Sequence, residues 1–170
     1  MKVLLLEDDE EMDSMLFMQT EEVLTRWVNY HLVKADDYRA RRLSKWDEDL
    51  QDSECYALLL KQLISAAGVV VDSSLLEFGY TCRLSSMEKA QAVLDAAELM
   101  GVEPILAPEN IISGHVLLNV IFVGQLFNAV SGLSLNHHVR EVKTTVFVVF
   151  LLELIKQLKH YVSIIDHSSM

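Results

Sequence analysis

Cysteine is scarce in this sequence, with only Cys55 and Cys82 among 170 residues. The two are not spaced as CxxC, and no nearby histidine pattern completes a metal-binding set. We therefore expect reduced thiols rather than a disulfide, and no bound metal. The chain also lacks a basic N-terminal stretch followed by an apolar run and a small-residue cleavage site. This absence argues against secretion and favours the cytoplasm.

Basic residues are few as well, with 14 Lys and Arg against 25 Asp and Glu and a net charge of −11. Eight of the acids lie in residues 1–22, where Lys2 is the only base. No basic surface interleaved with aromatic residues is visible, so nucleic acid is not an expected partner. The one basic stretch is KADDYRARRLSK (34–45). On charge alone it is more readily explained as a solvated loop than as a docking site for an acidic surface.

Recognisable catalytic patterns are missing. Ser, His and Asp are all present, but neither a nucleophile elbow nor a glycine-rich phosphate loop accompanies them. The sequence therefore predicts a binding module that is not an enzyme and carries no cofactor.

The opening residues, MKVLLLEDDEEM, imitate the first strand and acidic pair of a bacterial receiver domain. Such a domain needs an aspartate after a second strand and a lysine after a later one. Here Asp47, Asp49 and Asp52 precede a helical pattern, and Lys89 lies within another. The segment also lacks the glycine and the closing glutamate of a calcium loop. Both interpretations are rejected.

No alternation of strands and helices appears, whereas helical spacing recurs. We expect Thr20 to cap a first helix, and a second helix to start near residues 52–53. Residues 65–83 lack a clean period and are expected to be a loop, with room for a short turn of helix. The expected buried positions of the two helices are Leu24, Trp27, Val28, His31 and Leu32, then Tyr56, Leu59, Leu60, Leu63 and Ile64.

The third expected helix has the clearest boundaries, because Ser85 and Glu88 form a capping box and Gly101 supplies a left-handed stop. Its expected buried face consists of Met87, Ala90, Val93, Leu94, Ala97 and Met100. Pro108 suits the first turn of a short helix that Gly114 closes. Residues 117–130 are apolar nearly all round, which is typical of an enclosed central helix. These patterns together predict an all-α domain.

Four segments in order resemble a calponin-homology domain, and most closely the second of the four such repeats in the fimbrin (plastin) family. They are RWVNYHL (26–32), DLQDSECYALLLKQL (49–63), EKAQAVLDAAELMGV (88–102) and ENIISGHVLLNVIFVGQLFN (109–128). The resemblance implies a calponin-homology fold of four main helices plus short connecting helices. It also implies an acidic inter-repeat linker over 1–19, the domain over 20–135 and a divergent tail over 136–170.

The resemblance further implies that actin filaments are the partner, with weak binding by this domain alone and a place in the actin cytoskeleton. The alternative is a calponin-homology adaptor, or an orphaned fragment, that contacts other proteins without binding actin. The actin-binding residues carried over by position are Arg26, Asn29, Tyr30, Lys34, Arg39, Arg41 and Arg42. The residues expected to be critical for the fold are Trp27, Leu32, Asp49, Asp52, Tyr56, Gly101, Asn119 and Phe122.

The tail matches nothing in that family. Its run TTVFVVFLLELI (144–155) is about two-thirds of the ~18 residues that span a bilayer, and Glu153 interrupts it. A membrane anchor is therefore the least favoured of three interpretations. Residues 151–162 place apolar side chains at helical spacing. A helix packed on the domain is favoured over an interfacial or partner-binding helix.

Overall fold

The computed structural model describes residues 19–35, 41–70, 76–77 and 83–130. The described elements are α1 (Thr20–Lys34), α2 (Glu54–Ala67), α3 (Ser86–Leu99), α4 (Pro108–Ile112) and α5 (Val116–Ala129). Four of these helices have 14 or 15 residues and α4 has 5, with no strand in the described ranges. The predicted all-α fold of four main helices and a short connecting helix is confirmed. The expected linker (1–19, apart from residue 19) and tail (136–170) lie outside the described residues.

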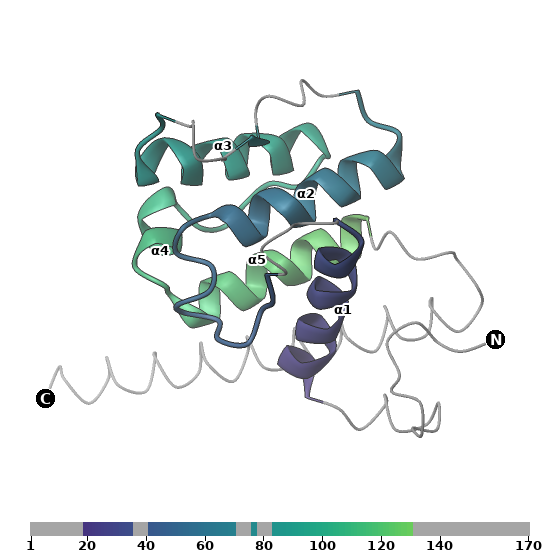
Figure 1. Cartoon of the computed structure of the whole chain (residues 1–170), viewed down its shortest axis with the longest axis horizontal. Helices are drawn as coiled ribbons and strands as arrows, with labels where there is room; N and C mark the ends of the chain where they lie inside the picture. The colour runs from purple at the N-terminus through teal and green to yellow at the C-terminus, as the bar shows by residue number, and fades with distance from the viewer. Residues whose placement is uncertain (1–18, 36–40, 71–75, 78–82, 131–170) are drawn as a thin grey trace, which may run out of the picture.

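Aromatic side chains from α1, α2 and α5 form the centre of the core. The Trp27 ring meets Phe127 edge-on with 5.2 Å between centroids, and Tyr56 meets Phe122 at 5.4 Å. Helix α1 packs against α2 and α5, while α3 packs against α2 and α4. In Figure 1, α1 runs at a steep angle to α2 and α5, and α3 lies above α2 in this view, on the side away from α5. Such edge-on aromatic pairs contribute about 0.5–1.5 kcal/mol each beyond the area that they bury.

The start of α3 has the predicted capping box. The Ser85 hydroxyl accepts a hydrogen bond from the Glu88 N–H at 3.3 Å, and the Glu88 carboxylate accepts one from the Ser85 N–H at 2.7 Å. The hydrogen bonds from the Ser85 backbone and hydroxyl lower the pKa of Glu88. At the other end of the helix, Gly101 adopts a φ of +79°. Both boundary signals of this helix are therefore confirmed.

Two expectations about the ends of helices are wrong. Thr20 is the first helical residue, and Gln19 precedes it without a side-chain cap. Residues 65–67 are helical, because α2 continues to Ala67 and ends at Gly68 in the left-handed region. These last residues are exposed, so no apolar period marks them, although alanine is the strongest helix former.

The expected buried face of α3 is correct except at Met100, which is only partly buried, and at Met87, which is 43% exposed. Met87 lies in the first turn of the helix. Helical side chains lean toward the N-terminus, so this one extends beyond the packed part of α3 into solvent. Ile64 in α2 is only partly buried against the core.

Gly114 sits in the tight connection between α4 and α5 with a φ of +69°. A Cβ atom here would lie 2.7 Å from the Asp47 carbonyl oxygen and 2.7 Å from the Gln51 side-chain nitrogen. A Cβ atom at Gly101 would meet nothing within 4 Å. The two glycines thus share a backbone conformation but differ in the space around them.

We predict that Gly114→Ala destabilises the domain more than Gly101→Ala does. Both changes force alanine into the left-handed region at a cost of about 1–2 kcal/mol. Gly114→Ala adds a clash with backbone, for which overpacking costs of about 1–3 kcal/mol are typical. Urea unfolding followed by circular dichroism measures both free energies, and equal losses for the two variants would contradict the prediction.

Candidate functional site

The outward face of α1 presents the first group of candidate contact residues. The Arg26 guanidinium lies 2.9 Å from the Glu22 carboxylate, one helical turn earlier. The Lys34 ammonium lies 4.3 Å from the centroid of the Tyr30 ring, within the range of a cation–π interaction. This face therefore carries a cation held over an aromatic ring at the end of the helix and a locally neutralised arginine.

Asn29 ties α1 to the loop that follows it in the described chain. Its side-chain amide donates to the Leu43 carbonyl at 2.9 Å, and its side-chain oxygen accepts from the Leu43 N–H at 2.7 Å. The Leu43 side chain is itself buried in the core. This reciprocal pair of bonds copies the pairing between two strands, so the loop is fixed against the helix at one residue.

Asp49 fixes the next residues of the same loop. Its carboxylate accepts hydrogen bonds from the N–H groups of Ser44 and Lys45, at 2.7 and 2.8 Å. Charge-assisted bonds of this kind are about twice as strong as neutral ones. The path of residues 43–45 is thereby determined by two side chains that lie outside it.

Arg41 points back into the domain rather than outward. Its guanidinium pairs with Asp52 and with Glu54, each at 2.6 Å. Burial alone would lower the pKa of Arg41, but the hydrogen bond and the negative charges of Asp52 and Glu54 outweigh burial and raise it. Arg42 is exposed, and its guanidinium donates to the Arg41 carbonyl at 2.8 Å.

The start of α2 depends on the same acids. Asp52 accepts a hydrogen bond from the Glu54 N–H at 2.9 Å, so it satisfies a free donor of the first helical turn. Ser53 between them is buried and has a φ of +64°, a conformation that non-glycine residues rarely adopt. Asp52 therefore both caps α2 and holds Arg41.

Asn119, in the first turn of α5, holds the opposite side of the loop. Its amide donates to the Trp46 carbonyl at 2.9 Å, and its side-chain oxygen accepts from the Tyr56 hydroxyl at 3.1 Å. Asn119 and Tyr56 are buried. The loop is thus attached to α1, α2 and α5.

The carried-over residues divide between α1 and the loop that Asn29 joins to it. Arg26, Tyr30 and Lys34 lie on α1, and Arg42 lies on the adjoining loop. Asn29 and Arg41 instead form bonds within the domain, and Arg39 lies outside the described residues. Sequence reasoning missed the anchoring role of Leu43, whose only sequence signal is that it is an isolated apolar residue within a charged stretch.

In the ranges that the structure describes, no group of three or more His, Cys, Asp or Glu side chains is arranged to hold a metal ion. The same residues contain no helix long and apolar enough to cross a bilayer. Cys55 is a free, buried thiol, and burial raises its pKa to about 11 although Arg41 opposes the shift. It is therefore protonated and unreactive at neutral pH.

A family model for the calponin homology (CH) domain matches residues 18–132, which contain all five helices and the loop. The chain belongs to the calponin-homology domain family. Within that family, fimbrin from Dictyostelium discoideum is 38% identical over 125 residues, covering 73% of this chain and 19% of that protein. Human plastin-1 is 30% identical over 126 residues, covering 74% of this chain and 20% of that protein. This calponin-homology chain thus spans about one-fifth of the length of these relatives.

The fold is also similar to the crystal structure of the actin-crosslinking core of Schizosaccharomyces pombe fimbrin. The TM-score is 0.60 at 29% sequence identity, with 75% of this chain and 26% of that chain covered. The fimbrin-like calponin-homology fold follows from these similarities.

We predict that this calponin-homology domain loses stability as the pH rises from about 9 to about 11. The folded state keeps the Cys55 proton to a pKa of about 11, whereas the unfolded chain releases it near 9.0. Stability from this difference is complete below pH 9 and amounts to at most about 2–3 kcal/mol. Urea unfolding at pH 7.5, 9, 10 and 11 should show a smaller decline for Cys55→Ala. Parallel declines in the two proteins would refute the assignment to Cys55.

Proposed function

We propose that the chain is an actin-filament-binding module of a fimbrin-like cross-linking protein, corresponding to its second repeat and acting in the cytoplasmic actin cytoskeleton. The proposed contact surface consists of the outward face of α1 and the exposed part of the loop, with Arg26, Tyr30, Lys34 and Arg42 as contacts. Arg39, which lies outside the described residues, is included in the proposal because of its position in the sequence.

The observation that carries this proposal is the reciprocal hydrogen bonding between Asn29 and Leu43. It joins the helix and the basic loop into one surface before any partner is met, so little conformational entropy is lost on binding. Asn29 and Arg41 are accordingly proposed as positioning residues. A few cations on a chain with a net charge of −11 support a weak interaction with an acidic filament.

An adaptor that contacts other proteins without binding actin is the second candidate. It is favoured by the overall negative charge and by the neutralisation of Arg26 and Arg41 through Glu22, Asp52 and Glu54. The dependence of filament binding on salt separates the two candidates, because exposed charges are screened at a distance of about 8 Å in physiological salt.

We expect weak co-sedimentation with actin filaments at low salt, and a loss of binding as the salt concentration rises. Arg42→Gln should weaken binding by about two- to fivefold at low salt and flatten its salt dependence, since one exposed charge pair is removed. The matched control is Arg83→Gln, which removes an exposed arginine just before α3 and should leave binding unchanged. Absence of binding, or binding that is insensitive to salt and to Arg42→Gln, would favour the adaptor.

We also expect the chain to bind filaments without bundling them. Cross-linking requires two surfaces that engage separate filaments, and the proposal supplies one. Low-speed sedimentation, which collects bundles but not single filaments, provides the measurement at concentrations where the chain is monomeric. Bundles formed by the monomer would show that a second filament-binding surface exists.

A further inference from the structure

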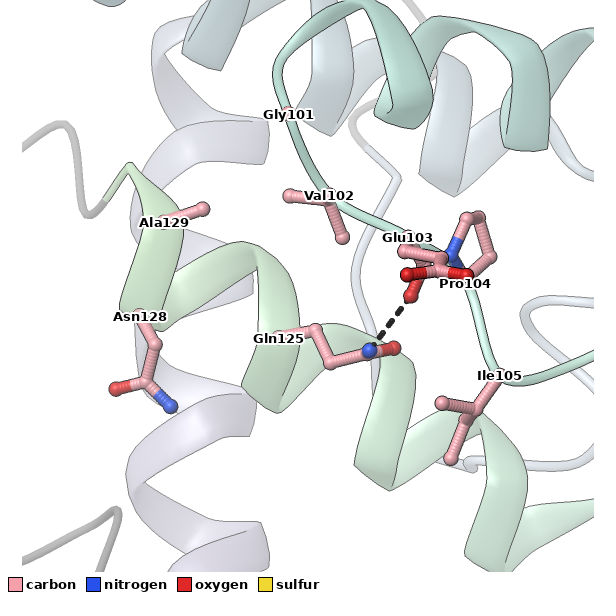
Figure 2. Close-up of a pocket in the computed structure, with 8 residues that line it drawn as sticks. All are labelled: Gly101, Val102, Glu103, Pro104, Ile105, Gln125, Asn128 and Ala129. Carbon is pink, nitrogen blue, oxygen red and sulfur yellow. Dashed lines mark hydrogen bonds between the residues drawn. The ribbon is translucent and has the colours of Figure 1, made fainter.

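A cleft lies on the side of the domain formed by the connection after α3 and the end of α5. It has a volume of about 620 Å³, with residues 101–105 on one side and Gln125, Asn128 and Ala129 on the other. Figure 2 shows the Gln125 amide reaching across to the Glu103 carbonyl, to which it donates a hydrogen bond of 2.8 Å. This bond holds the two walls together, so the cleft is part of the folded domain.

The cleft combines an exposed apolar side chain with a negative charge. Ile105 in its wall is 52% exposed, and Glu103 lies in the same wall. Glu103 is the charged residue of the lining, which contains no Lys or Arg. A complementary occupant is therefore an apolar segment that carries positive charge.

The chain itself contains such a segment beyond α5. Residues 143–162, KTTVFVVFLLELIKQLKHYV, are largely apolar and carry three lysines against Glu153 alone. The positive excess contrasts with the net charge of −11 on the whole chain. We propose that residues 143–162 of the same chain dock in this cleft.

The position where the chain leaves α5 supports this occupant over others. Ala129, the last residue of α5, lines the cleft, so the chain continues from its rim. Residues 131–142 can reach up to about 40 Å at 3.3–3.6 Å per residue, which covers any point of the cleft. A tether of this length gives residues 143–162 an effective concentration at the cleft in the millimolar range. Even a weak intrinsic affinity is therefore sufficient to keep the cleft occupied.

The test uses the full chain with a photoreactive p-benzoylphenylalanine in place of Ile105. Irradiation should give a cross-linked product with the mass of one chain, and mass spectrometry should place the cross-link within residues 143–162. The matched control carries the same group at Val70, which is 99% exposed and does not line the cleft; it should give no such product. A product with the mass of two chains would assign the cleft to a second copy, and no cross-link to residues 143–162 would also overturn the proposal.

Hydrogen exchange of the full chain provides a second, independent readout. Ile105→Glu places a charge in the apolar wall and should speed exchange in peptides from 143–162 by about tenfold or more. Val70→Glu, a matched change on exposed surface away from the lining, should leave these peptides unchanged. Circular dichroism verifies that both variants remain folded. Equal exchange in the unaltered chain and in Ile105→Glu would refute the docking.

Discussion

The buried side chain of Asn119 connects more of this domain than any packing contact described above. It accepts a hydrogen bond from Tyr56, 63 residues earlier, and donates one to the carbonyl of Trp46, 73 residues earlier. An amide inside an apolar helix is costly unless its groups are satisfied. The Asn119 amide is satisfied only when Tyr56 and the Trp46 carbonyl are both in place. This requirement fixes one arrangement of α2, α5 and the loop before α2.

The loop shows the same dependence on distant residues. Asn29 bonds both backbone groups of Leu43, Asp49 bonds the next two N–H groups, and Asp52 and Glu54 hold Arg41. Residues 41–45, the described end of the basic stretch, thus owe their path to acids and amides on either side of them. Part of its positive charge is neutralised in the process. The surface left for an acidic partner is therefore smaller than the number of arginines indicates.

The sequence predicted what depends on local rules. Ser85 with Glu88, Gly101, and Pro108 with Gly114 mark helix boundaries through bonds or dihedral angles within a few residues, and these predictions held. Met87 and residues 65–67 were misjudged, because exposure at a helix end depends on where the neighbouring helices stop. Thr20 was misplaced by one position, since α1 begins at this residue and has no side-chain cap. At the candidate site, periodicity placed both Tyr30 and Lys34 on the outer face of α1, but only Lys34 is exposed and Tyr30 is partly buried against the core. Periodicity gave no indication that Asn29 would bond to Leu43, since that pairing depends on the path of the intervening chain.

The way in which the loop is held has a consequence for how this surface changes in evolution. Asn29 and Asp49 grip the backbone of residues 43–45, which every amino acid except proline offers in the same form. The exposed side chains at Arg42 and Lys45 bond to near neighbours, the Arg41 carbonyl and the Glu48 carboxylate, whereas the bonds to α1 and to Asp49 come from the backbone. Substitutions at these two positions can therefore alter the charge, and with it the partner, while the scaffold beneath them is inherited intact.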